Sequence, residues 1–159
     1  MRLMMKLLAP LLFWIAYGLF RSPIGRRSKR CHDGIMKLFR IAAESGHRRA
    51  LSVYGHLLHF RGEGSANRIQ GALYLQRAAE QGEPKALYQM GRIYEQGYEH
   101  RFAVDESRAL DAYRRAAEAG HPLAIKRMLE LCRDGGLGMT PDAAQQRHWQ
   151  ARQHRPASG

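Results

Sequence analysis

A histidine pair is the first feature of this sequence whose spacing could support chemistry. His56 and His59 lie three residues apart, which would place both rings on one face of a helix. That spacing suits a metal ion, but a metal site needs at least a third protein ligand, and none is evident near the pair. The sequence therefore favours solvated histidines over a metal centre.

The glycine clusters and the cysteines are the other candidates for chemistry. The clusters at residues 62–64 and 135–138 lack the preceding strand and the Lys-Ser/Thr of a phosphate-binding loop, so they are interpreted as turns. Cys31 and Cys132 belong to no C-x-x-C pair, which argues against a disulfide framework or a zinc site. No Ser/His/Asp or Cys/His set is discernible by spacing. We therefore predict no catalytic residue, no metal and no cofactor.

The elements that carry these residues are set by an internal repeat. Residues 42–46 read AAESG, residues 78–82 read AAEQG and residues 116–120 read AAEAG, giving periods of 36 and 38 residues. Two small residues side by side let neighbouring helices approach closely, and the glycine ends the helix and turns the chain. Self-similarity at such a period is typical of stacked helical hairpins.

A second series of alanines, Ala50, Ala86 and Ala124, runs in step with the first. Each opens a segment, here called helix A, whose apolar residues recur at i, i+3, i+4 and i+7 and so define one buried stripe. Cys132 falls on this stripe and is predicted to be a buried core residue. The stripe residues are Leu51, Tyr54, Gly55 and Leu58; Leu87, Met90, Gly91 and Tyr94; and Ile125, Met128, Leu129 and Cys132.

Each helix A is expected to end in a glycine-bearing loop, at residues 61–67, 95–106 and 133–140. A second helix, helix B, then leads to the AAExG motif. The predicted caps of helix B are Asp105 or Ser107 in the second repeat, and Thr140 followed by Pro141 and Asp142 in the third. His47 and His121 directly follow the motif glycine in two repeats, which predicts a role in the hairpin turn.

These hairpins cannot bury both apolar faces alone, so they must stack into a curved superhelix. We predict a leading helix B at residues 34–46, then repeats at about 47–82, 83–120 and 121–152, and a disordered tail at 153–159. The last helix B is more polar, with Ala144, His148 and Ala151, as a terminal cap facing water should be. Trp149 is expected to pack at this end.

The recurring residues resemble the Sel-one-like repeat family, a relative of the tetratricopeptide repeats, over residues 34–152. The family pattern is A-x-x-x-L-G-x-x-Y-x-x-G followed by K-A-x-x-W-Y-x-x-A-A-x-x-G. The first repeat departs from it at Gly71 and Leu75. The resemblance implies an all-α, right-handed α-solenoid of helix-turn-helix repeats, and a non-enzymatic adaptor that holds a protein or peptide. The second repeat matches at Ala86, Met90, Gly91, Tyr94, Gly97, Ala109, Tyr113, Ala116, Ala117 and Gly120.

Tetratricopeptide geometry, taken by analogy, puts the positions two, six and nine residues after each helix-A alanine on the concave side. The mixed polar set found there suits a polar peptide better than an apolar helix, although each residue could equally be part of an ordinary hydrated face. The predicted partner-binding residues are Ser52, His56 and His59; Tyr88, Arg92 and Glu95; and Lys126, Glu130 and Arg133.

The chain begins with an apolar helix, residues 1–21, whose segment 7–20 contains no charged residue. We predict a membrane anchor, followed by a basic linker at residues 22–33. More basic residues follow the apolar segment than precede it, which favours a bacterial-type inner membrane with the repeats in the cytoplasm. The linker would lie against anionic headgroups through Arg21, Arg26, Arg27, Lys29 and Arg30.

Two alternatives for the apolar segment stay open. A cleavable signal peptide would place the repeats in the periplasm, where they would act in envelope or cell-wall assembly. A leading helix A is the other alternative, because three residues match the first repeat at an offset of 37: Tyr17, Gly18 and Gly25 resemble Tyr54, Gly55 and Gly62.

The net charge bears on the choice of partner. The 26 Lys and Arg against 14 Asp and Glu give +12, which favours acidic partners, nucleic acid or anionic lipid. Residues 1–34 hold seven of the basic residues and only Asp33 as an acid, so the excess is concentrated beside the apolar segment. This distribution disfavours nucleic acid and favours a membrane-associated interaction scaffold; a cell-wall-active enzyme ranks third.

Overall fold

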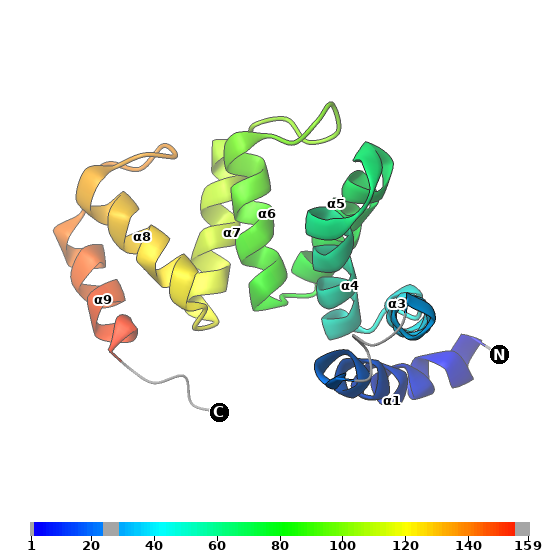
Figure 1. Cartoon of the computed structure of the whole chain (residues 1–159). Coiled ribbons are helices and arrows are strands. Elements are labelled where there is room, and N and C mark those ends of the chain that lie inside the picture. The colour runs from blue at the N-terminus through cyan, green and yellow to red at the C-terminus, as the bar shows by residue number, and fades with distance from the viewer. Residues whose placement is uncertain (1, 24–28, 155–159) are drawn as a thin grey trace. The chain divides into compact units, whose positions relative to one another are not determined.

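The computed structural model describes residues 2–23 and 29–154, and within them it contains eight helices and no strand beyond two isolated bridges (Figure 1). Residues 155–159 of the tail predicted at 153–159 lie outside the described residues, as do the linker residues Arg26 and Arg27, whereas Gln153 is helical. The all-α expectation is confirmed. In chain order the helices are α1 (Arg2–Arg21), α3 (Lys29–Glu44), α4 (Arg48–Arg61), α5 (Gly64–Glu80), α6 (Pro84–Gln96), α7 (Glu106–Glu118), α8 (Pro122–Asp134) and α9 (Ala143–Gln153).

The helices form two compact units, residues 1–81 and 82–159, here called the amino-terminal and carboxy-terminal units. Within each unit, each helix packs on the next one along the chain: α1 on α3, α3 on α4 and α4 on α5, then α6 on α7, α7 on α8 and α8 on α9. Contacts between sequence neighbours are what a repeat architecture requires. Helices α4, α6 and α8 are the predicted helix-A elements, and α3, α5, α7 and α9 are the helix-B elements.

The AAExG motif ends three helices, each with buried alanines and a left-handed glycine. All six alanines are buried, at most 7% exposed. The motif glycines Gly46, Gly82 and Gly120 have φ of 84°, 76° and 86°, a left-handed conformation that side chains disfavour. After α3, the His47 amide donates to the Ala42 carbonyl over 3.2 Å and the Gly46 amide to Ala43 over 2.9 Å. This paired arrangement is a Schellman motif, and it recurs after α7.

The residue that caps each helix A also recurs. The His47 and His121 rings accept hydrogen bonds through Nδ1 from the amides of Ala50 and Ala124, at 3.2 and 3.4 Å. The predicted hairpin-turn role of both histidines is therefore confirmed. Glu83 stands at the same position of the middle repeat, and its carboxylate accepts from the Ala86 amide at 2.7 Å. Each cap satisfies an amide that the first helical turn leaves without a partner.

Most of the predicted helix-A stripe lies in the core, whereas Leu58, Tyr94 and Leu129 are only half-buried. Leu51, Leu87 and Ile125 are buried at equivalent positions, as are Tyr54, Met90 and Met128. Cys132 is 1% exposed, and burial raises the pKa of its thiol, as expected of a core residue rather than a reactive one. At the far end, Trp149 is the one buried residue of α9, whereas Ala144, His148 and Ala151 are exposed. The terminal packing predicted for Trp149 is confirmed.

Glycines set how closely α4 and α5 approach. A Cβ built on Gly71 would lie 2.4 Å from the His59 amide nitrogen and 2.7 Å from the Gly55 carbonyl oxygen. A Cβ on Gly55 would lie 2.9 Å from the Gly71 carbonyl oxygen in turn. Only glycine fits at either position. The close crossing of α4 and α5 therefore requires glycine at position 71, where the repeat pattern has alanine.

Some predicted boundaries were wrong. Helix α3 already includes Lys29, before the predicted start at Gly34, so part of the predicted linker is helical. Gly34 sits inside the helix with open space around it and does not break it. Helix α5 begins at Gly64, inside the loop expected at 61–67, because a turn at Gly62 and Glu63 suffices to connect it to α4. The caps of α7 and α9 are Asp105 and Asp142.

Helix α1 packs on α3 through one face, formed by Ala9, Phe13 and Ala16. The structure therefore gives the apolar segment a place beside the repeats. The packing at Gly18 nevertheless differs from that at Gly55, because a Cβ on Gly18 would meet nothing within 4 Å, whereas a Cβ on Gly55 would lie 2.9 Å from backbone atoms of α5. The likeness of Tyr17 and Gly18 to Tyr54 and Gly55 does not extend to their packing.

Gly71→Ala is expected to destabilise the amino-terminal unit by about 1–3 kcal/mol, because the added methyl group collides with backbone that cannot move independently. Gly34→Ala is the matched control, since Gly34 lies within α3 with open space around it; it should stabilise by about 0.5–1 kcal/mol through helix propensity. Urea unfolding followed by circular dichroism measures both. Equal effects of the two substitutions would contradict the close crossing of α4 and α5.

The histidine caps should make stability depend on pH. Burial, with Arg49 and Arg48 nearby, lowers the pKa of His47; burial and Lys85 lower that of His121 against an opposing effect of Glu83. Their stabilisation is thus present above the unfolded pKa of 6.5 and is lost as the pH falls below it. Protonating Nδ1 also removes the cap acceptor, which costs about 1 kcal/mol per helix.

A His47→Asn, His121→Asn variant should retain the caps without titrating, since asparagine is a good capping residue. Thermal unfolding of both proteins between about pH 7.5 and pH 5 tests this. The difference in melting temperature between the parent chain and the variant should widen toward acid. Parallel pH profiles would argue against a titrating cap.

Candidate functional site

The structure places the nine predicted partner-binding residues in three environments. His56, Arg92, Lys126 and Arg133 are exposed on α4, α6 and α8. His59, Tyr88, Glu95 and Glu130 are half-buried. Ser52 is buried, only 5% exposed, so its hydroxyl is not presented at the surface. Serine is too short to reach past its neighbours, whereas Tyr88 and Lys126 at the equivalent position are long.

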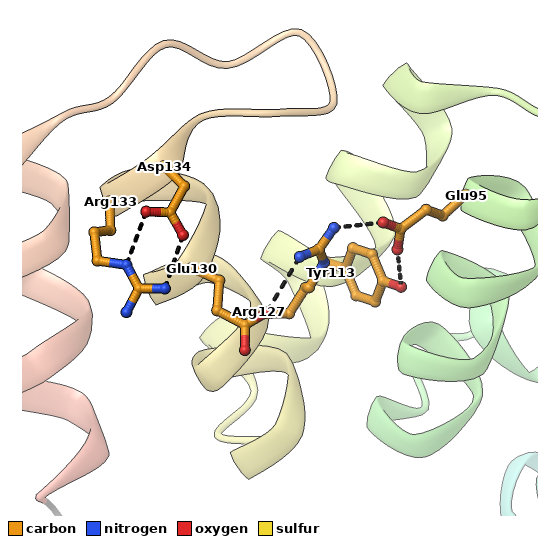
Figure 2. Close-up of polar contacts among 6 residues, drawn as sticks. All are labelled: Glu95, Tyr113, Arg127, Glu130, Arg133 and Asp134. Atoms are coloured by element: carbon orange, nitrogen blue, oxygen red, sulfur yellow. Dashed lines mark hydrogen bonds and ion pairs between the residues drawn. The ribbon is translucent and has the colours of Figure 1, made fainter.

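A polar network joins three helices of the carboxy-terminal unit (Figure 2). The Tyr113 hydroxyl on α7 donates to Glu95 Oε2 on α6 at 2.6 Å. Arg127 on α8 pairs with the other oxygen of Glu95, and its second nitrogen lies 3.1 Å from Glu130 Oε2. Burial and the hydrogen bond to Glu95 raise the pKa of Tyr113. Glu95 and Glu130 are thereby already committed to partners within the protein.

The same tyrosine explains why the second repeat keeps its helix-A glycine. A Cβ on Gly91 would lie 2.7 Å from the Tyr113 ring, so the ring lies directly against the backbone of α6. The ring is 1% exposed, and its hydroxyl reaches the half-buried Glu95. Leucine replaces this tyrosine at position 75 of the first repeat and cannot make such a bond.

Three of the other predicted contacts in the carboxy-terminal unit are positively charged, namely Arg92, Lys126 and Arg133. Arg133 forms two hydrogen bonds to Asp134, at 2.9 and 2.7 Å, fully exposed to solvent (Figure 2). Tyr88 stacks on the His121 ring with centroids 4.8 Å apart. Within the described part of the chain, Arg92 and Lys126 have no carboxylate partner in an ion pair. These two cations are available to an external acidic group.

In the amino-terminal unit both histidines of the pair, His56 and His59, contact neighbouring residues of the protein. His59 Nδ1 lies 3.1 Å from the Arg68 carbonyl oxygen of α5. The rings of His56 and His59 both contact Phe60, which is 49% exposed. Among residues 2–23 and 29–154, no three potential metal ligands come together. The arrangement offers an aromatic surface for contact with a partner.

The predicted membrane-surface residues lie in and beside α1 and α3. Arg21, Lys29 and Arg30 are exposed. The Arg21 guanidinium lies 5.9 Å from the centre of the Tyr17 ring. Residues Met4–Arg21 form a helix long and apolar enough to cross a membrane, with a mean hydropathy of 1.3, near the amino terminus. Length and composition of this kind are shared by membrane anchors, signal sequences and buried core helices.

Stacked helical hairpins with in-phase alanines, glycines and caps define a tandem α-helical repeat protein. The family model described as the Sel1 repeat matches residues 36–47, 49–83 and 84–121, more than half of the chain. The chain belongs to the Sel1 repeat family, as its resemblance to the Sel-one-like repeats predicted. Proteins of this family generally mediate protein–protein interactions and are typically non-catalytic.

Two solved structures share the fold. A Sel1 repeat protein from Oxalobacter formigenes is 20% identical with a TM-score of 0.76 over 95% of this chain. A protective antigen present in uropathogenic Escherichia coli strains, which displays an SLR fold, is 27% identical with a TM-score of 0.74 over 91% of this chain. The chain spans 58% and 30% of the lengths of these two proteins. The predicted solenoid fold is confirmed. No curated protein sequence matches.

Tyr113→Phe should cost the carboxy-terminal unit about 1–2 kcal/mol, because it leaves Glu95 Oε2 half-buried without its donor. Arg133→Gln breaks a solvent-exposed pair and serves as the control, with no measurable change expected in the unfolding midpoint. Chemical unfolding of both variants at neutral pH provides the comparison. A loss in Arg133→Gln as large as in Tyr113→Phe would show that the network does not stabilise the unit.

Proposed function

We propose that this protein is a non-enzymatic scaffold that binds a partner protein or peptide through exposed helix-A residues, on α6 and α8 of the carboxy-terminal unit and on α4 of the amino-terminal unit. The supporting observation is a division of labour among the repeat positions. The residues that recur in phase form the turns, cap the helices or pack in the core. The helix-A positions outside this frame differ from repeat to repeat: at one equivalent position His56 and Arg92 are exposed and Glu130 is half-buried, so this position can distinguish one partner from another.

The charge of this surface favours an acidic segment as the partner. Arg92 and Lys126 carry the charges left over after Arg127 is paired with Glu95 and Glu130. An acidic peptide would offset these charges, and the half-buried aromatic side chain of Tyr88 in the same unit adds apolar contact area. The remaining predicted contacts are His56, His59, Glu95, Glu130 and Arg133.

Site-specific photo-crosslinking tests the binding surface. A photoreactive residue at position 92 or 126 should capture one partner, whereas the same residue at the exposed position 111 on α7 should not. Arg92→Glu with Lys126→Glu should reduce capture at least about tenfold through loss of charge complementarity. Arg108→Glu with Arg115→Glu, exposed on α7, makes the same charge change as a control. Equal capture from position 111, or unaffected capture by the charge-reversed variant, would contradict the assignment.

We further propose that residues 1–21 tether the scaffold to a bacterial-type inner membrane, with the repeats on the cytoplasmic side. The basic residues that follow the apolar segment support this orientation. Cleavage of the segment on export, the alternative, would remove α1 from α3 and expose the completely buried Phe39, whose ring lies 6.0 Å from those of Phe13 and Phe20. The packing therefore favours a segment that is retained.

Fractionation with protease accessibility separates the two topologies. The repeats should be protected from protease in intact cells and spheroplasts and should sediment with the membrane until detergent is added. Recovery of a soluble chain that lacks residues 1–18 would contradict the tether and favour the exported form.

A further inference from the structure

Helix α1 has two opposite faces, and the inward one is occupied. Ala9, Phe13 and Ala16 are buried at i, i+4 and i+7, which is one side of a helix. The rings of Phe13 and Phe20 each lie 6.0 Å from the Phe39 ring of α3. Figure 1 shows α1 beside α3 at the start of the chain. This side of α1 is therefore part of the core of the amino-terminal unit.

The outward face is equally apolar but uncovered. Leu7 is 75% exposed, Leu11 57% and Trp14 54%. Soluble proteins seldom leave a contiguous apolar face of this kind in water, and when they do it marks an interaction surface. This outward face consists of Met4, Leu7, Leu8, Leu11, Trp14 and Ile15.

The charges around the outward face indicate what covers it. Lys6 and Arg21 stand near the two ends of α1, both exposed, and the helix contains no acidic residue. From α4, the Arg49 guanidinium lies 5.8 Å from the centre of the Trp14 ring, which brings a further positive charge to the edge of the face. An apolar face with an interfacial tryptophan and a basic rim is the chemistry of binding to anionic lipid.

The packing of α1 on α3 argues against a membrane-crossing orientation. Helix α3 exposes Lys29, Arg30, Lys37 and Arg40, and a bilayer-spanning α1 would draw its attached neighbour toward the hydrocarbon. Charged side chains are costly to place at the bilayer centre. Pulling α1 away from α3 would instead expose Phe39, which is completely buried. Lying along the surface avoids both costs.

We propose that α1 lies in the plane of an anionic membrane surface, with its outward face at the acyl boundary and α3 and α4 on the aqueous side. This inference rests on the proposed membrane tether and specifies its geometry and its lipid. The amino-terminal unit is then held flat on the bilayer by a helix that is also part of its core, rather than hanging from a transmembrane stalk.

The depth of Trp14 tests the in-plane geometry. The full chain carrying Trp149→Phe has Trp14 as its one tryptophan, since the sequence contains two. It is bound to phosphatidylglycerol–phosphatidylcholine vesicles whose acyl chains carry bromine at defined depths. Shallow bromines should quench most strongly, as for a helix buried about 5–10 Å into the headgroup and acyl boundary. Strongest quenching near the bilayer centre would overturn the proposal, because Trp14 lies near the middle of the candidate span Met4–Arg21.

Substitutions on the outward face provide the second test. Leu11→Asn with Ile15→Asn should weaken vesicle binding more than about tenfold, given the apolar area lost, while leaving the unfolding midpoint unchanged. Leu123→Asn makes the same chemical change at an exposed position of the carboxy-terminal unit and should bind like the parent chain. Undiminished binding by the α1 variant would overturn the proposal.

The vesicle experiments also distinguish failure of the in-plane geometry from failure of the membrane tether. Binding to phosphatidylglycerol vesicles but not to pure phosphatidylcholine supports the anionic surface, whereas equal binding to both overturns it. A parent chain that binds neither vesicle defeats the tether and the in-plane geometry together. Binding with deep quenching defeats only the in-plane geometry and leaves the tether standing.

Discussion

The joint between consecutive helical hairpins is the constraint on which the rest of the structure depends. Buried alanine pairs let helices approach closely, and a left-handed glycine reverses the chain within one turn. The side chain of the next residue, His47, Glu83 or His121, then caps the following helix. The helix contact, the turn and the cap use the same positions in every repeat. The residues at these positions are therefore constrained by the fold and cannot also vary to suit a partner.

The turns, caps and core positions of the repeats can be predicted from the sequence, because each repeat can be compared with the others in the same chain. Ala42, Ala78 and Ala116 identify each other, and the caps His47 and His121 are visible as a matched pair. The cap Glu83 was missed because its chemistry differs, although its phase marks it. The links of Arg127 and Tyr113 to Glu95 span 32 and 18 residues and follow no local spacing, so only the fold reveals them.

The packing of helix α1, by contrast, could not be predicted from the sequence. Its inward residues Ala9, Phe13 and Ala16 have a clear helical period, but nearly every position around them is also apolar, so the pattern has no contrast. A wholly apolar helix is compatible with a membrane span, a signal sequence or a core helix. The contact with Phe39 is what distinguishes its two faces. Likewise, Ser52 was placed by analogy with positions where longer side chains reach the surface.

Together these features describe a protein whose frame and binding specificity reside in different residues. The most direct measurement of that claim is a mutational scan of residues 34–152 that reads protein abundance and partner capture separately. In-phase turn, cap and core positions should lower both readouts, whereas Arg92, Lys126 and the other exposed outward positions should lower capture at unchanged abundance. Capture that follows abundance at every position would contradict the account.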